Sequence, residues 1–200
     1  MSPEEKIHGI SHPRSQGLID AAYRFARKAH GSQVRKYTGE NYVDSHCCEV
    51  ARLVASVTSD CTIIAAAFLH DVLEDTPVTY DVLAAQEAGF GHDIAMLVVG
   101  MTDVSQPGDG NRAFRKALDR QHMAMQNAKV HTIKLADLIS NTRSIVEHDP
   151  DFARVYLKEK ELLLEILEDG HAELLEHART LLVQGQMQLE KDDEYELEKC

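Results

Sequence analysis

The residues with the clearest chemical potential lie at the end of one very apolar stretch, AAAFLHDVLED. His70 and Asp71 follow five apolar residues, and two more acids come one helical turn later. Residues four apart share a helix face, so His70 is predicted to lie above Glu74, and Asp71 above Asp75. Charged groups beside such apolar residues need an opposite charge, either a metal ion or Lys and Arg. The spacing therefore predicts a cation site, although for Asp75 alone a helix end facing water is the favoured interpretation.

Two distant residues complete a predicted metal site. His46 begins another helix after a glycine-containing loop, and Asp137 lies inside the apolar helical run VHTIKLADLISNT. Asn141 follows Asp137 by one turn, on the same face. Two imidazoles and two carboxylates form a mixed nitrogen and oxygen set, which suits Mn²⁺, Fe²⁺ or Zn²⁺ better than Ca²⁺. The pattern H…HD…D thus predicts one divalent ion held by four side chains.

Helical periodicity dominates the elements that must position these residues. Apolar residues recur at helical spacing over 15–30 and 45–58, and a third helix begins near Asp60 or Thr62 and ends before Thr76-Pro77. Alternation typical of a strand does not extend beyond a few residues. The predicted fold is all-α, a compact helical bundle with short connections. Further helices are expected at 79–88, 91–101, 111–126, 128–147, 150–168 and 171–184.

The chain of 200 residues carries 33 acidic and 21 basic residues, a formal net charge of −12. Residues 159–200 hold 13 acidic and 4 basic residues, a net of −9, whereas Arg14–Lys36 and Arg112–Lys134 are basic. This balance excludes a protein that coats nucleic acid or anionic membranes, and leaves basic surface for a small anion. No apolar run would span a bilayer, and no signal-peptide core is present. Four cysteines without a CxxC pair favour free thiols in a reducing cytoplasm.

Three blocks of sequence carry a family resemblance. AYRFARKAHGSQVRKYTGENYVDSH, AAAFLHDVLEDTPVT and IKLADLISNT, in this order, resemble the hydrolase domain of the RelA/SpoT alarmone family, one of the HD-domain metal-dependent phosphohydrolases. The resemblance covers about residues 18–165, without synthetase or regulatory domains. The chain is thus similar to stand-alone small alarmone hydrolases, the class that includes the metazoan SpoT-like hydrolase. The resemblance implies a single HD hydrolase domain over residues 1–185. We expect the acidic tail over residues 186–200 to fray.

The resemblance implies a reaction and a role for each matching residue. The family reaction is hydrolysis of (p)ppGpp to GDP or GTP plus pyrophosphate. His46, His70, Asp71 and Asp137 would bind one Mn²⁺, with other divalent ions open, and Glu74 and Asp75 would be the catalytic acids. The nucleotide would contact five residues: Arg35, Lys36, Tyr42, Asn141 and Tyr156. The chain departs from the family pattern at Cys47, where proline is usual, at Leu138, where a basic residue is usual, and at Ser140, where histidine is usual.

The chemistry is also plausible without the resemblance. A divalent ion lowers the pKa of water from ~15.7 toward ~7, which supplies a nucleophile at neutral pH. Glu74 or Asp75 would then transfer protons, and the sequence leaves their division of roles open. Two alternatives stay open as well: a phosphatase acting on NADPH or another 2′- or 3′-phosphorylated nucleotide, and a non-catalytic nucleotide sensor. The Leu162–Leu167 stripe is typical of a core or a dimer seam, so a homo-oligomer is also open.

Overall fold

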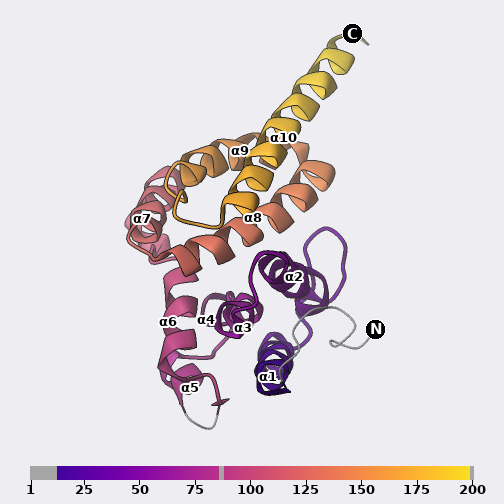
Figure 1. Cartoon of the computed structure of the whole chain (residues 1–200). Coiled ribbons are helices and arrows are strands. Elements are labelled where there is room, and N and C mark those ends of the chain that lie inside the picture. Colours follow the sequence, from indigo (N-terminus) through magenta and orange to yellow (C-terminus); the bar gives the residue numbers. More distant parts are fainter. Residues whose placement is uncertain (1–12, 86–87, 199–200) are drawn as a thin grey trace.

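The computed structural model describes residues 13–85 and 88–198. Over these ranges the chain is a bundle of helices, which confirms the all-α prediction (Figure 1). A single isolated β-bridge, between Val34 and Asn41, closes the loop after the first helix. A π-helical turn, Val43–Cys47, leads into α2, and a 3₁₀ turn, Pro107–Asp109, precedes α7. The helices are α1 (Pro13–His30), α2 (Cys48–Val57), α3 (Cys61–Leu69), α4 (Val72–Asp75), α5 (Tyr80–Ala84), α6 (Gly91–Met101), α7 (Arg112–Ala124), α8 (Ala128–His148), α9 (Pro150–Leu164) and α10 (Ala172–Glu198).

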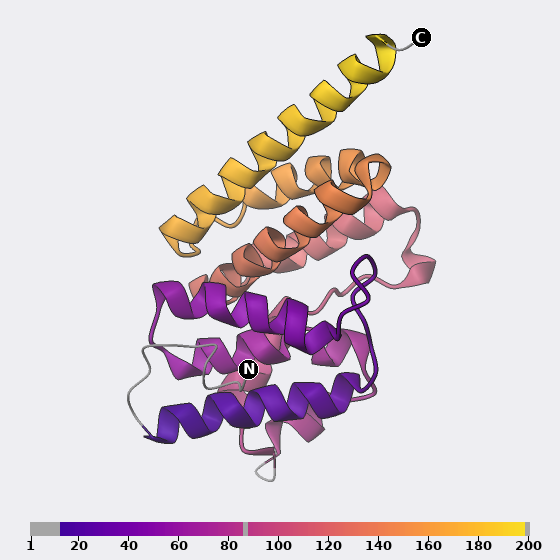
Figure 2. The same cartoon turned by 90° about the vertical axis from the view of Figure 1, so that its right-hand side faces the viewer.

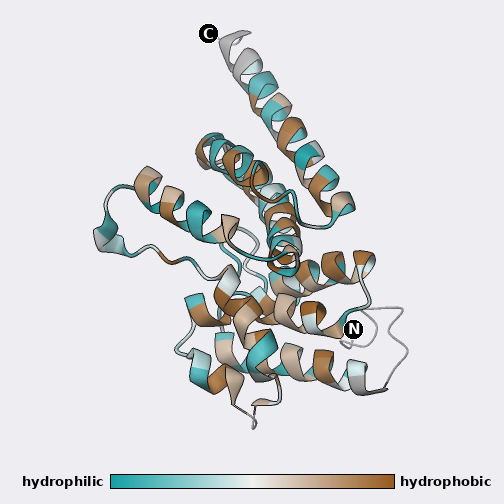
Figure 3. Cartoon of the chain, turned by 60° about the vertical axis from the view of Figure 1, so that its left-hand side comes forward, coloured by the Kyte–Doolittle hydropathy of each residue, from teal (hydrophilic) through white to brown (hydrophobic). Residues whose placement is uncertain are grey.

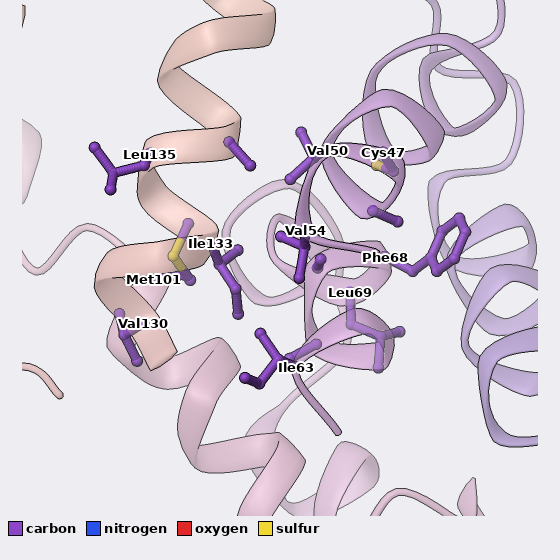
Figure 4. Close-up of a cluster of buried hydrophobic side chains, with 14 of the residues drawn as sticks. Cys47, Val50, Val54, Ile63, Phe68, Leu69, Met101, Val130, Ile133 and Leu135 are labelled. Atoms are coloured by element: carbon purple, nitrogen blue, oxygen red, sulfur yellow. The ribbon is translucent and has the colours of Figure 1, made fainter. Parts of the chain in front are cut away.

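Helix α3 is the central element of the lower half of the molecule. Every residue from Ile63 to Leu69 is buried, and α3 packs against α1, α2, α6 and α8. Asp60 is its N-cap, because the Asp60 side chain accepts a hydrogen bond from Thr62 N at 2.9 Å. Of the two predicted starts, Asp60 is therefore the one observed. Figure 4 shows how α2, α3, α6 and α8 contribute side chains to one apolar cluster, among them Val50, Val54, Ile63, Leu69, Met101 and Ile133.

Helix α8 joins the two halves of the bundle. It contacts α2, α3 and α6 on one side, and α9 and α10 on the other (Figures 1 and 2). Such a helix is buried on nearly every face, and from Val130 to Ser140 only Lys134 escapes full burial. This position carries Asp137 into the interior, toward the histidines of the lower half.

The helix that was predicted to run unbroken to Asp75 is divided in two. Helix α3 ends at Leu69, and α4 begins at Val72. Asp71 lies between them at φ −97° and ψ −1°, a region of backbone conformation in which many active-site residues are found. The His70 ring bonds to Ala67 O, the carbonyl that an unbroken helix pairs with the Asp71 N–H. As a result, the His70 ring contacts the Asp71 carboxylate at 2.9 Å. The prediction had placed His70 above Glu74 and Asp71 above Asp75.

The acidic tail is the second point at which the structure differs from the prediction. Residues 186–200 were expected to fray, and the last two of these lie outside the described residues. Helix α10 nevertheless continues to Glu198 and extends beyond the rest of the bundle (Figure 2). Polar and apolar residues alternate along it (Figure 3), and Leu182 and Leu189, two turns apart, are both buried. Glutamine, methionine, leucine, glutamate and lysine are good helix formers, and this outweighs the like charges. Among the described helices, none is long and apolar enough to cross a bilayer.

Candidate metal centre and pocket

Four predicted ligands meet where the π-helical turn before α2, the break between α3 and α4, and α8 come together. His46 Nε2 lies 3.2 Å from His70 Nε2, 3.5 Å from Asp71 Oδ2 and 3.4 Å from Asp137 Oδ1. His70 Nε2 lies 2.9 Å from Asp71 Oδ2 and 3.8 Å from Asp137 Oδ1. Both histidines are only 1% exposed. Two imidazole nitrogens and two carboxylate oxygens, separated by up to 91 residues in sequence, thus face one small volume.

The outward nitrogen of each histidine is held by the surrounding chain. His70 Nδ1 lies 2.8 Å from Ala67 O, which only accepts, so this nitrogen carries the proton. His46 Nδ1 lies 3.0 Å from Ser140 Oγ, and the Ser140 hydroxyl donates to Glu49 Oε2 at 2.6 Å. The serine oxygen is therefore left to accept from His46. In both rings Nε2 is the nitrogen that faces the cluster, which is how metal-binding histidines are usually oriented.

The electrostatics of the cluster favour a positive charge at its centre. Burial lowers the pKa of His46, but hydrogen bonds to Asp137 and Asp71 outweigh it and raise that pKa to about 9. Burial likewise acts to raise the pKa of Asp137, but the positive charge of Lys134 and the hydrogen bond to His46 hold it well below its ordinary value. The pKa of Asp71 is also lowered, chiefly by His70. The site therefore stabilises cationic partners for its two carboxylates.

A divalent ion fits this cluster. Atoms that each lie about 2.1 Å from one ion are separated by about 3 to 3.5 Å in tetrahedral or octahedral geometry, close to the distances found here. Donor atoms of His46, His70 and Asp137 all lie within 4.8 Å of one another. Without a cation, four electron-rich atoms would face each other in a buried place, which is costly. The donor set and its burial thus meet the requirements of a mixed nitrogen and oxygen metal site.

Ser140 provides a test of this arrangement. Replacing Ser140 with alanine removes the acceptor for His46 Nδ1 and leaves Glu49 and Arg35 in place. We expect metal affinity to fall about 10- to 100-fold, as is typical when an outer partner of a metal ligand is lost. Titration with Mn²⁺, followed by calorimetry, measures the loss directly. Ser144→Ala is the matched control, because Ser144 lies one turn further along α8 and its Oγ has no hydrogen-bond partner among the described residues; equal affinity in both variants would contradict the role.

The two predicted catalytic acids lie at the mouth of a cavity beside the cluster. Glu74 accepts a hydrogen bond from Asp103 N at 3.3 Å, and Asp75 accepts one from Gln33 Nε2 at 2.9 Å. Although Glu74 is exposed as a whole residue, partial burial of its carboxyl and the negative charge of Asp103 raise its pKa to about 7. A carboxyl with such a pKa exchanges protons readily at neutral pH. The Tyr42 hydroxyl donates to Asp71 Oδ2 at 2.5 Å and orients that carboxylate.

The cavity has a volume of about 370 Å³ and lies between α4, α7, α8 and α9. Three of the predicted nucleotide contacts, Tyr42, Asn141 and Tyr156, line it. The structure does not bring Arg35 and Lys36 into it. Arg35 donates to Ser140 O at 2.8 Å and lies near Glu49, behind the metal cluster, whereas the Lys36 ammonium pairs with Asp149 Oδ2 at 3.2 Å on the surface.

Most of the cations that line the cavity come instead from the second basic segment of the sequence, Arg112–Lys134. Lys134 lies 2.9 Å from Asp137 Oδ2, and Lys116 lies 2.6 Å from Asp103 Oδ2. Lys134 precedes Asp137 by three residues and so shares its helix face, a spacing that would have identified it in the sequence. The position of Lys116 in the cavity depends on a contact between α7 and the loop before it, and the sequence contains no spacing that would have indicated this contact. Four cations of this segment line the cavity: Arg112, Lys116, Arg120 and Lys134.

Comparison with known proteins places this site in a family. The family described as "HD domain" matches residues 22–164. The bifunctional (p)ppGpp synthase/hydrolase SpoT of Escherichia coli (strain K12) is 38% identical over 141 residues, which are 69% of this chain and 19% of that protein. A guanosine-3′,5′-bis(diphosphate) 3′-pyrophosphohydrolase of Aquifex aeolicus (strain VF5) is 34% identical over 150 residues, 72% of this chain and 20% of that protein. The chain therefore spans about a fifth of the length of these relatives.

One solved structure matches this chain over most of the length of both proteins. It is that of a metazoan ortholog of SpoT described as hydrolysing ppGpp, with a TM-score of 0.75 and 25% sequence identity. The match covers 87% of this chain and 97% of that one. Since the HD domain match extends over residues 22–164 and encloses all four residues of the buried cluster, this chain belongs to the HD domain family, among relatives of the SpoT and RelA type.

Proposed function

We propose that this protein hydrolyses the 3′-pyrophosphate of guanosine alarmones, converting (p)ppGpp and water to GDP or GTP and pyrophosphate. The observation that carries the proposal is the cluster of two imidazoles and two carboxylates at the edge of a cavity lined by five Lys and Arg side chains. A nucleotide with two diphosphate groups needs such cations. The names of the E. coli and A. aeolicus relatives and the metazoan neighbour support the same substrate.

The residues that would hold the ion are His46, His70, Asp71 and Asp137, and we propose Mn²⁺ as the physiological metal. The mixed nitrogen and oxygen donors suit Mn²⁺, with Fe²⁺ and Zn²⁺ as the other candidates. When bound, such an ion lowers the pKa of water and polarises a phosphoryl oxygen. Lys134 and Lys116 would neutralise charge on the 3′-diphosphate, because both line the cavity next to these ligands.

Protein side chains would carry the proton steps. Glu74 accepts the proton of the attacking water, whose oxygen forms a bond to the 3′-linked phosphorus. The bond from that phosphorus to the ribose 3′-oxygen breaks, and Glu74 returns a proton to this oxygen. Asp75, held by Gln33, orients the water. Asn141, whose Nδ2 donates to Asp137 Oδ1 at 2.6 Å, lies where it would contact the ribose, and Tyr156 forms a wall of the nucleotide site.

The setting of the reaction is part of the proposal. Among the described residues, Cys47 and Cys61 are free thiols, which supports a reducing cytoplasm. The partner is a small nucleotide rather than a nucleic acid or a membrane, since the net charge of −12 opposes both of these polyanions.

The test is parallel turnover of ppGpp, NADPH and pGpp by the Mn²⁺-loaded protein. We expect release of pyrophosphate from ppGpp at a kcat/KM at least about 100-fold above that for either of the other two. Release of orthophosphate from NADPH with no turnover of ppGpp would favour the alternative phosphatase. Tight binding of ppGpp without any product would favour the non-catalytic sensor.

A further inference from the structure

Lys160 is an unusual residue of the cavity wall. It lies on α9, lines the cavity and is only 1% exposed. Its Nζ donates to Thr142 Oγ1 at 2.8 Å. Within residues 13–85 and 88–198, no ion pair joins Lys160 to a carboxylate, and burial alone lowers its pKa to about 7. Lysine is almost never fully buried unless it is paired, so this position requires an explanation.

The ammonium group has unused capacity to donate hydrogen bonds. An ammonium carries three N–H donors, and Thr142 takes one of them. The Thr142 hydroxyl itself donates to Leu138 O at 2.5 Å, so the threonine oxygen is a fixed acceptor. The remaining donors of Lys160 lie in an apolar part of the wall, where unsatisfied polar groups are costly. A ligand with hydrogen-bond acceptors would remove that cost.

The position of Lys160 along the cavity indicates which chemical group of such a ligand would lie next to it. Asp137, Asn141 and Ile145 line the cavity on successive turns of α8. The helical rise places Ile145 about 12 Å along the helix axis from Asp137, which marks the metal end of the cavity. The cations that suit phosphates, Lys116 and Lys134, belong to the metal end, where they pair with Asp103 and Asp137.

The wall around Lys160 is different in character. Lys160 is one turn from Tyr156 on α9. Apart from the Arg112–Glu159 ion pair, the neighbouring lining residues are aromatic or aliphatic: Leu138, Ile145, Phe152 and Leu163. Flat apolar and aromatic walls suit a planar base, and a phosphate there would lose its water in exchange for a single cation.

We propose that Lys160 selects the base of the substrate, with Nζ donating to the O6 and N7 acceptors of a 6-oxopurine. This inference rests on the proposed function, and it names a specificity residue of the same site. Guanine presents two acceptors, O6 and N7, on this edge, whereas adenine replaces O6 with an amino donor. The ammonium therefore favours guanine over adenine, and Lys160 accounts for a preference that the metal centre, which meets only phosphate, does not provide.

Lys160→Met tests the proposal because it keeps an unbranched side chain, shorter by only the terminal atom, and removes the donors. We expect kcat/KM for ppGpp to fall about 10- to 100-fold, the usual loss for a hydrogen bond to a charged group, and kcat/KM for adenosine 5′-diphosphate 3′-diphosphate to change less than about threefold. The melting temperature should not fall, since an unpaired buried charge is replaced by an apolar group. Lys158→Met is the matched control, an exposed lysine on the same helix, and should leave both substrates unaffected.

Binding measurements separate this inference from the proposed function. Calorimetry with GDP and ADP should show a preference of the wild-type protein for GDP that Lys160→Met loses, whether or not ppGpp is hydrolysed. If the protein turns over ppGpp but the guanine-to-adenine ratio is the same in wild type and Lys160→Met, the role of Lys160 is overturned and the proposed function stands. If ppGpp is not hydrolysed and the GDP preference is lost only in Lys160→Met, the proposed function fails and Lys160 keeps its role.

Discussion

Replacing Asp71 with alanine is expected to abolish release of pyrophosphate from ppGpp and to remove most of the bound metal. Asp71 Oδ2 lies 2.9 Å from His70 Nε2 and 3.5 Å from His46 Nε2, so it lies within 3.5 Å of both imidazoles. Its loss removes a ligand and half of the negative charge that holds the ion. The expected decrease in kcat is at least ~10³-fold, larger than the 10- to 100-fold typical of an outer partner. Metal analysis of the purified variant, together with the ppGpp assay, measures both effects.

The control for this variant is Asp93→Ala, which removes an exposed carboxylate in the first turn of α6. It should retain full metal content and full turnover. Circular dichroism should show the same helical content for both variants, because Asp71 lies between helices and its carboxylate is not part of the apolar core. Normal turnover by a folded Asp71→Ala protein with normal metal content would show that the assignment of this cluster is wrong.

Replacing Glu74 with glutamine is expected to lower kcat by about 10²- to 10⁴-fold, the usual contribution of a general acid or base. The pKa of Glu74 is raised to about 7 by burial and by the negative charge of Asp103. Below that pH the carboxyl is protonated and cannot accept the proton of water. Wild-type kcat/KM should therefore rise as the pH increases through about 7, with a somewhat lower midpoint when a divalent cation is bound. Glutamine does not titrate, so this rise should disappear in the variant.

Glu161→Gln, an exposed position on α9, is the matched control for Glu74→Gln and should keep both the rate and the pH dependence. Metal content should be unchanged in Glu74→Gln, which separates a loss of proton transfer from a loss of the ion. If the pH-dependent rise persists in Glu74→Gln, another group carries the proton, and Asp75 becomes the principal candidate.

The meeting of the four predicted ligand residues could be expected from the sequence, because buried polar residues in apolar helices need partners. His46, His70 and Asp137 come from three segments far apart in sequence, and each stands out against its apolar neighbours. The break between α3 and α4 was not predictable, because helical periodicity continues through AAAFLHDVLED and the departure lies in the backbone around Asp71. The local pattern thus identified the residues of the cluster, and tertiary packing determined how they face each other.

The nucleotide contacts were harder to predict because long cationic side chains reach several partners. Arg35 was expected at the base, and instead it contacts Ser140 and Glu49, residues 105 and 14 positions away. Lys160 was hidden within VYLKEKE, which resembles an exposed charged face. It nevertheless shares a buried stripe with Ala153, Leu157 and Leu164, at helical spacing. Such a lysine in a core position is a signal that sequence analysis can use.

The α10 helix shows the limit of arguments from charge. Repulsion among acids suggested a frayed end, but the cost of like charges at helical spacing is only a few tenths of a kcal/mol per pair in water. Burial of Leu182 and Leu189 along one face stabilises the helix by more than this. Composition alone does not reveal which of the two effects is larger.

Hydrolysis of ppGpp in ¹⁸O-labelled water is the most direct test of the central claim, that water attacks the 3′-linked phosphorus at this metal centre. The Mn²⁺-loaded protein is incubated with ppGpp, and the products are separated and analysed by mass spectrometry. The proposed mechanism predicts pyrophosphate carrying one ¹⁸O atom and GDP carrying none. Labelled orthophosphate, label in the ribose of GDP, or intact ppGpp would each contradict it.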